Sequence, residues 1–278
     1  MSIKKRIKLL LILPILLFRM CFYLLTIKRD TLTILTFHGF SSKSEKNKFD
    51  VTELEKLIQL LSRVFKFIPV DKFKLGMGRC LAFTVDDGLS DYMIAHEIFR
   101  INNITPYLFV TKGFAEGYCI DWPSKNKILG IDKEKFIGKS YTDILLMMNI
   151  NDKAIDNEYL TTKELIDLVS VGEVILGGHG EYHLYVSKGN LSLALTEFEN
   201  SLEFISSLGQ NSYIRYYAFP NGTYDDVLID CYQQKILNGF LFTQDYGINL
   251  PHERVLKRIQ MNWDENYLLN FFRILWIG

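Results

Sequence analysis

Cysteine is scarce in this chain, with four among 278 residues, and they stand far apart at Cys21, Cys80, Cys119 and Cys231. No CxxC pair occurs, which argues against a cysteine zinc cluster. Only three cysteines lie beyond the apolar N-terminal segment, so disulfides within one domain would leave at least one of them unpaired. We therefore expect the cysteines to act as small packing residues.

An excess of one charge is also missing. Lys and Arg together number 32, as do Asp and Glu, and no basic run interleaved with aromatic residues follows the N-terminal segment. This balance does not indicate a nucleic-acid partner, and a neutral partner such as a glycan fits it at least as well. With 48% hydrophobic and 14% aromatic residues, the chain can bury the core of one large α/β domain.

The longest apolar run lies at the N-terminus. Basic residues precede the segment from Leu9 to Ile27, which is long enough to cross a bilayer. No small-residue cleavage site follows, so residues 1–29 are predicted to form a membrane anchor, which holds residues 30–278 at the cell membrane on the extracytoplasmic side. Arg19 interrupts the run. An interfacial helix on the cytoplasmic face, a removed signal peptide and a buried helix therefore remain alternatives.

Short apolar runs alternate with segments of helical periodicity after residue 30. Strands are expected at 31–37, 67–70, 81–85, 107–110, 174–176, 213–219 and 240–243, and helices from 54, 90, 161, 191, 225 and 266. Capping-box patterns at Thr52–Glu55 and Thr161–Glu164 mark two of the helix starts. The alternation predicts a mainly parallel sheet with helical crossovers, in the form of a distorted or incomplete (β/α) barrel.

Polar residues follow several of the predicted strands. Because parallel strands end at the same edge of a barrel, these residues are expected to lie together, where barrel enzymes place their chemistry. They are His38, Asp86, Asp87, His179, Pro220 to Gly222 and Asp245. The long connection from Lys112 to Leu160 either shapes a substrate groove at this edge or elaborates the packing.

Two of these patterns carry metal-ligand types. His179 and His183 are separated by three residues, and Asp86 and Asp87 follow an apolar strand. Taken singly, the histidine spacing arises often by chance and an Asp-Asp-Gly sequence is usually a turn. Together they supply two imidazoles, a carboxylate ligand and a spare carboxylate, which is the inventory of a hydrolytic metal site.

These residues also resemble a known family. The sequences Phe83–Gly88, Gly178–His183 and Tyr217–Gly222 are similar, in order and spacing, to three motifs of the polysaccharide deacetylases, which have the NodB-homology fold of carbohydrate esterase family 4. The resemblance runs from about Thr31 to Met261. It implies a metal-dependent hydrolase that removes N-acetyl or other N-acyl groups from a sugar or polysaccharide of the bacterial envelope.

Residue roles follow from the resemblance. It implies that Asp87, His179 and His183 bind a divalent metal, usually zinc, and that Asp86 is the general base. The segment Leu35–Gly39 resembles a His-Gly element of a subgroup that acts on exported β-linked glucosamine polymers, which makes His38 the candidate general acid.

Two further elements are assigned in the same way. Arg258 resembles an arginine that orients the base. A groove wall with a backbone N–H for the oxyanion is implied for Phe219, Pro220, Asn221 and Gly222.

The chain departs from the family pattern at two positions. Gly180 stands where Ser or Thr usually follows the first histidine, and Asn221 stands where a Tyr is usual. These departures leave open a glycan-binding or assembly protein of the same fold that has lost turnover. Amide hydrolysis on a small molecule that is not a glycan is a further alternative.

Overall fold

The computed structural model describes residues 30–150, 158–210 and 214–277. The predicted membrane anchor, residues 1–29, lies outside these ranges. Within them, no helix combines the length and the apolar character that crossing a bilayer requires.

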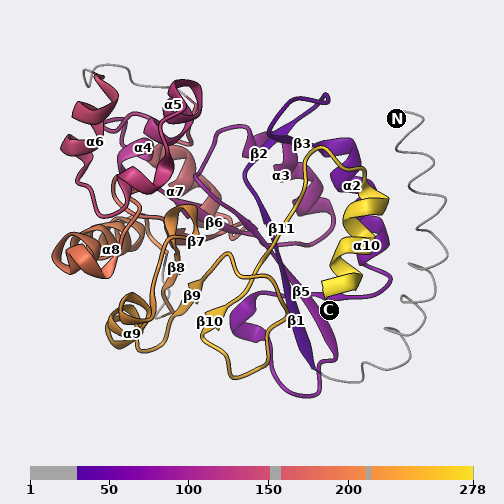
Figure 1. The fold of residues 1–278 in the computed structure, drawn as a ribbon. Coiled ribbons are helices and arrows are strands. Elements are labelled where there is room, and N and C mark those ends of the chain that lie inside the picture. The colour runs from indigo at the N-terminus through magenta and orange to yellow at the C-terminus, as the bar shows by residue number, and fades with distance from the viewer. Residues whose placement is uncertain (1–29, 151–157, 211–213, 278) are drawn as a thin grey trace.

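One parallel sheet of nine strands forms the centre of the described chain (Figure 1). Its order is β10-β9-β8-β7-β6-β5-β1-β11, with β4 beside β5. The strands are β1 Thr31–Phe37, β4 Lys66–Phe67, β5 Arg79–Val85, β6 Tyr107–Val110, β7 Ile175–Gly178, β8 Tyr216–Ala218, β9 Phe240–Phe242, β10 Val255–Leu256 and β11 Ile259–Gln260. A separate pair, β2 Gly39–Ser41 and β3 Lys48–Asp50, follows β1.

The sheet curves until a single short segment reaches both of its edges. β10 pairs with β9 at one edge and β11 pairs with β1 at the other, although only Lys257 and Arg258 separate β10 from β11 in the chain. This confirms the predicted fold class, a distorted (β/α) barrel. The closure also places Arg258 at the seam, where its side chain can enter the barrel.

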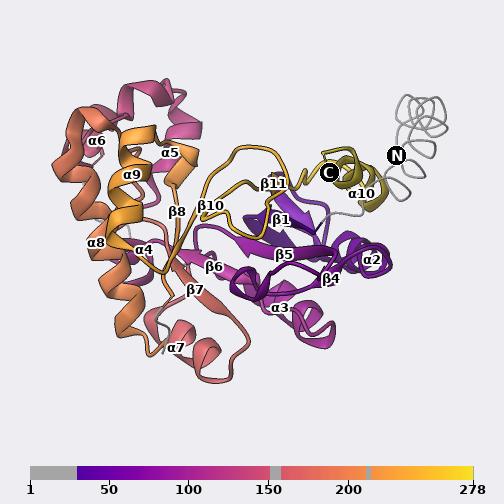
Figure 2. The same ribbon diagram turned by 90° about the horizontal axis from the view of Figure 1, so that it is seen from below.

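Helices surround the sheet and complete the barrel layers (Figure 2). Helices α2, α3 and α10 pack over β1 and β5, whereas α8 packs beside β7 and α9 beside β9. The insertion between β6 and β7 carries α4 to α7. The bounds are α2 Val51–Leu61, α3 Tyr92–Ile101, α4 Lys112–Ala115, α5 Trp122–Leu129, α6 Tyr141–Met148, α7 Thr162–Ser170, α8 Leu191–Ser207, α9 Asp226–Lys235 and α10 Tyr267–Ile277.

Alternation along the strands decides which side chains enter the barrel. The even-numbered residues Leu32 and Ile34 of β1 and Cys80 and Ala82 of β5 share one apolar cluster on the inner face of the sheet. On the outer face, the odd-numbered residues of both strands, from Leu35 and Leu81 onward, pack against α2, α3 and α10. The two strands pair Thr36 with Thr84, whose hydroxyl oxygens lie 3.0 Å apart. Two residues further on, this inward row reaches His38 and Asp86.

The helix starts show which local signals were reliable. Thr161 caps α7, and Thr161 and Glu164 form the predicted capping box. The capping box predicted at Thr52 is wrong, because Asp50 is the N-cap of α2 and its carboxylate accepts a hydrogen bond from the Thr52 N–H at 2.8 Å. Asp is as effective an N-cap as Thr, and here it lies two residues earlier.

Candidate metal centre and catalytic site

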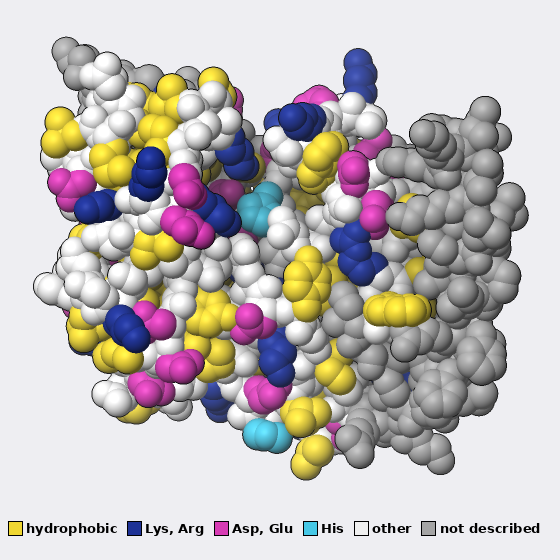
Figure 3. Space-filling model, in the orientation of Figure 1, with side chains coloured by type: hydrophobic (Ala, Val, Ile, Leu, Met, Phe, Trp, Pro, Cys, Tyr) yellow, Lys and Arg dark blue, Asp and Glu magenta, His cyan; other side chains and the backbone are white. Residues whose placement is uncertain are grey.

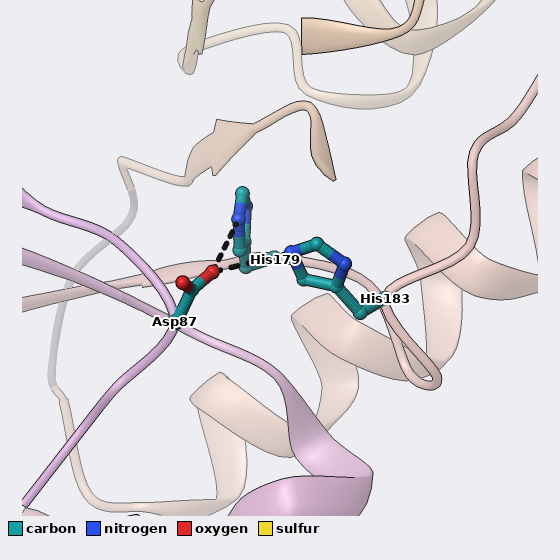
Figure 4. Close-up of side chains that lie close together, drawn as sticks. All are labelled: Asp87, His179 and His183. Carbon is teal, nitrogen blue, oxygen red and sulfur yellow. Dashed lines mark hydrogen bonds and ion pairs between the residues drawn. The ribbon is translucent and has the colours of Figure 1, made fainter. Parts of the chain in front are cut away.

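Three side chains from two distant parts of the chain converge beyond the carboxyl ends of β5 and β7. Oδ1 of Asp87 lies 3.3 Å from Nε2 of His179 and 3.2 Å from Nε2 of His183 (Figure 4). One potential ligand atom from each residue lies within 4.8 Å of the other two. Both imidazoles are buried, whereas 24% of the Asp87 side chain is exposed.

Local backbone conformations turn these side chains toward one another. Asp87 follows β5 with a φ of 73°, and His183 has a φ of 57° in the loop after β7. Both values fall in the left-handed region, which non-glycine residues adopt rarely and mostly at constrained sites. The positive φ of Asp87 turns its side chain away from the direction that continuing β5 would give it. The positive φ of His183 turns the loop so that the His183 ring lies near the His179 ring.

The protonation of His179 bears on whether a cation fits here. Its Nδ1 lies 2.8 Å from the carbonyl oxygen of Ala218, which can only accept, so Nδ1 carries the proton. In the neutral ring, Nε2 then directs a lone pair at the Asp87 carboxylate. That contact is repulsive unless a proton or a cation lies between the two atoms.

The donor set therefore fits a divalent metal. Two imidazole nitrogens and one carboxylate oxygen are typical ligands of zinc at sites that keep a position open. Burial raises the pKa of Asp87, but the His179 and His183 side chains beside it outweigh burial and hold that pKa well below its usual value. The carboxylate is thus ionised, as a ligand must be. On the face seen in Figure 3, a histidine side chain is visible in a depression between acidic and basic side chains.

Asp86 lies beside this cluster and inside the barrel. Its Oδ1 accepts a hydrogen bond of 2.7 Å from Nη1 of Arg258, and both side chains are buried, at 0% and 1% exposure. Arg258 is held in turn by the carbonyl oxygen of Thr243 and the hydroxyl of Thr84. Burial raises the pKa of Asp86, but the Arg258 guanidinium, with smaller effects of His179 and His38, outweighs burial and brings the pKa below its usual value.

The second oxygen of Asp86 is available for chemistry. Oδ2 is buried and has no hydrogen-bond partner in the described part of the chain. A buried acceptor without a donor is costly in a folded protein, and such atoms concentrate at functional sites. Arg258 thus fixes one oxygen of the carboxylate while the other remains free to accept a proton.

His38 reaches the same region from β1. It is half-buried, and its charge lowers the pKa of both Asp86 and Asp87. The Asp86 N–H donates to the carbonyl oxygen of Phe37 at 2.9 Å, which continues the β1–β5 pairing up to this residue. The sequence-predicted His38, Asp86, Asp87, His179, His183 and Arg258 therefore lie in one place.

The segment from Phe219 to Gly222 supplies one candidate N–H donor. The Phe219 ring is buried and stacks on Tyr232, and its N–H donates to the carbonyl oxygen of Phe242 at 3.3 Å. Pro220 has no N–H, and the Gly222 N–H donates to the Phe219 carbonyl oxygen. The N–H of Asn221, with its positive φ of 53°, has no partner among the described residues.

The insertion between β6 and β7 packs against the second histidine. The rings of Phe114 and Trp122 lie 6.0 and 6.4 Å from the His183 ring, and Phe114 stacks on Tyr159 at 4.4 Å. Trp122 also donates its indole N–H to the carbonyl oxygen of Tyr182. The sequence left open whether this insertion shapes a substrate groove or elaborates the packing. Its aromatic core packs against the loop that carries His183.

Glu197 of α8 was not among the residues predicted from the sequence. This carboxylate is buried and contacts the loop that carries His183. The available signal was its place on α8, since Ala194, Phe198, Ser201 and Leu202 are buried on the same face. A charged residue at a core-facing position of an amphipathic helix indicates a specific partner.

Solved structures share this architecture. The Streptococcus pyogenes deacetylase PplD, in complex with acetate, matches with a TM-score of 0.64 and 15% identity over 89% of this chain and 99% of that chain. IcaB from Ammonifex degensii matches with a TM-score of 0.63 and 15% identity over 88% and 97% of the two chains.

A de-N-acetylase from Aggregatibacter actinomycetemcomitans matches with a TM-score of 0.59 and 16% identity, over 87% of this chain and 100% of that chain. No family model and no curated protein matches the sequence. The resemblance inferred from the three motifs is confirmed by these structures at the level of the fold. This chain has the fold of the NodB-type polysaccharide deacetylases.

Proposed function

We propose that the protein is a metal-dependent hydrolase that removes N-acyl groups, chiefly N-acetyl, from a sugar or polysaccharide of the bacterial envelope. The observation that carries the proposal is the convergence of Asp87, His179 and His183 beside the buried Asp86–Arg258 pair. The fold is also shared with BC0361, a polysaccharide deacetylase from Bacillus cereus, which supports a glycan as the substrate class.

A divalent metal held by Asp87, His179 and His183, most simply Zn²⁺, would supply Lewis-acid activation of water and of the acyl oxygen. The remaining groups act around it. Oδ2 of Asp86 accepts the proton of the attacking water while Arg258 keeps the carboxylate in place. The Asn221 N–H donates to the acyl oxygen as negative charge develops there.

Bond cleavage then needs an acid for the leaving nitrogen. The oxygen of water adds to the acyl carbon, the C–N bond breaks, and the amine takes a proton from His38. The products are a free amine and acetate, or formate from an N-formyl substrate. His38 fits this role because it faces the same cluster as Asp86 from the neighbouring strand.

The departures from the family motifs do not remove this machinery. Asn221 replaces a usual tyrosine, but a backbone N–H is independent of the side chain. Binding of a glycan at Asn221 would lack an aromatic stacking surface at that position, so substrate recognition is expected to differ. We further propose that residues 1–29 hold the domain at the cell membrane, which fractionation of cells and protease accessibility would test.

The experiment is a paired measurement of metal content and of acetate release from N-acetylated oligosaccharides. The wild-type chain and Asp86→Asn are compared, with His252→Gln as a control because His252 is exposed in a distant loop. We expect about one metal ion per wild-type chain, with acetate released by wild type and His252→Gln only. Protein that carries metal but frees no acetate or formate from any glycan would instead favour the glycan-binding alternative.

A further inference from the structure

We propose that Glu197 is the residue that holds the His183 loop in its metal-ligating conformation. The inference rests on the proposed metal site and adds a positioning residue to it. It starts from a carboxylate that is 2% exposed and lies opposite the backbone of the loop that joins the two histidines.

One oxygen of Glu197 collects the N–H groups of this loop. Oε2 accepts hydrogen bonds from the N–H of Glu181 at 3.1 Å, of Tyr182 at 3.1 Å and of Leu184 at 3.5 Å. These residues flank His183 on both sides. The carboxylate therefore fixes the chain immediately before and after the ligand.

The carbonyl groups of the same loop are held from the opposite side. The Thr111 hydroxyl donates to the His179 carbonyl oxygen at 3.0 Å, and the N–H groups of Lys112 and Gly113 donate to the carbonyl oxygens of Gly180 and Glu181 at 3.2 and 2.8 Å. The loop is thus clamped between the start of α4 and Glu197. Without Glu197, only the contacts from Thr111 to Gly113 would hold the loop in which His183 adopts its left-handed conformation.

Glu197 also accounts for Gly180. A Cβ at position 180 would lie 2.9 Å from Oε2 of Glu197, and Gly180 has a φ of 81°. A side chain there would collide with the carboxylate and strain the backbone. The Glu197 carboxylate thus occupies the space beside position 180, where the family pattern usually has a hydroxyl-bearing side chain.

The environment of Glu197 indicates a dedicated role. Burial raises its pKa to about 7, against the opposing effect of the loop N–H groups. No Lys, Arg or His pairs with it among the described residues, so loop N–H groups supply its stabilising contacts. Burying a carboxylate costs free energy that an apolar residue at the same helix position would not cost. Its presence at a core-facing position therefore indicates that the carboxylate itself has a role.

The test compares two replacements of similar length. Glu197→Gln keeps an acceptor oxygen, whereas Glu197→Met fills the space without one. The dissociation constants for Zn²⁺ and Co²⁺ are measured by competition with a chromophoric chelator, and the Co²⁺ absorption spectrum reports the ligand geometry. Glu203→Gln is the matched control, since Glu203 is exposed on the same helix.

We expect Glu197→Met to weaken metal binding about 10- to 100-fold and to alter the Co²⁺ spectrum, as loss of a group that orients a ligand does. Glu197→Gln should stay within about threefold of wild type, because its amide oxygen can still accept. If Glu197→Met does not fold, Gly180→Ala perturbs the same loop, both through the close approach of its Cβ to Glu197 and through the positive φ of position 180, and weaker metal binding is expected.

The outcomes separate this inference from the proposed function. Wild-type protein that binds no metal would overturn the metal site and this inference with it. Wild-type protein that binds metal, together with folded Glu197→Met or Gly180→Ala that binds it equally tightly with the same Co²⁺ spectrum, would overturn the role of Glu197 alone.

Discussion

Nη1 of Arg258 lies 2.7 Å from Oδ1 of Asp86, and neither side chain reaches solvent. The two residues are 172 positions apart in the chain, and the barrel closure brings them together. Asp86 ends the inward row of β5, and Arg258 lies between β10 and β11, which pair with opposite edges of the sheet. The contact therefore joins the closure of the fold to the carboxylate that we propose as the general base.

Breaking this pair should destabilise the fold. Arg258→Met leaves Asp86 buried without its cation, which costs about 3–5 kcal/mol of unfolding free energy. Urea denaturation monitored by circular dichroism would measure the loss. The double variant Arg258→Met/Asp86→Asn should recover part of it, because no uncompensated charge remains. Additive losses in the two variants would show that the pair is not coupled.

Replacing the proposed base should separate chemistry from metal binding. Asp86→Asn keeps a hydrogen-bond acceptor for Arg258 but cannot take up a proton at neutral pH. We expect turnover to fall by about 10²- to 10⁴-fold while metal content stays at the wild-type level. Acetate release and metal analysis on the same preparation would measure both, and an active Asp86→Asn would remove this residue from its assigned role.

Metal binding should stabilise the folded chain. A ligand at about 1,000 times its dissociation constant adds about 4 kcal/mol to the unfolding free energy if it binds only the folded state. We therefore expect a chelator to lower the melting temperature of wild type and to have no effect on His183→Ala, which lacks one of the three ligands. His252→Gln should respond as wild type does. An equal response of His183→Ala would place the metal elsewhere.

The positions of the candidate catalytic residues were predictable because strand periodicity and parallel pairing are local rules. Asp86 and His179 were placed at strand ends from short apolar runs, and both lie there. The chain from Tyr107 to Val110 forms the strand expected for it. Strands β5 and β6 of the nine-stranded sheet are buried on both faces, so they form apolar runs that are easily recognised in the sequence.

Other features depend on contacts that no local pattern encodes. The closing segment Val255–Gln260 forms two strands of two residues each, too short for a periodic signal. Asp87 and His183 adopt left-handed conformations, which Asp and His take more often than most other non-glycine residues but still rarely, so residue type alone did not mark these positions. The partner of Glu197 is a loop backbone, which the sequence does not specify by side-chain type.

The stability of the metal-free protein should depend on pH through Glu197. Its pKa is raised to about 7 in the folded state by burial, so the folded chain binds a proton more tightly than the unfolded chain. Stability is then greatest below the unfolded pKa and declines as pH rises toward 7, by up to about 3 kcal/mol.

Glu197→Gln removes this ionisation. The difference in unfolding free energy between the variant and wild type should therefore shift in favour of the variant between about pH 4.5 and 7 and stay constant above pH 7. The charged or titratable groups near Glu197 are Glu181, Tyr217 and Tyr232, and the two tyrosines do not ionise in this range. Chemical denaturation at several pH values would measure the difference. A pH-independent difference would contradict the prediction.

The role of His38 can be tested through the leaving group. An amine leaves only when it is protonated, whereas a nitrophenolate leaves without a proton. His38→Gln should therefore lower turnover of an N-acetylated oligosaccharide by about 10²-fold or more, yet change hydrolysis of a nitrophenyl acetate by only a few-fold. Metal affinity should stay at the wild-type level, because His38 is not among the three converging ligands. Equal losses on both substrates would assign His38 to positioning of water or of the base rather than to protonation of the amine.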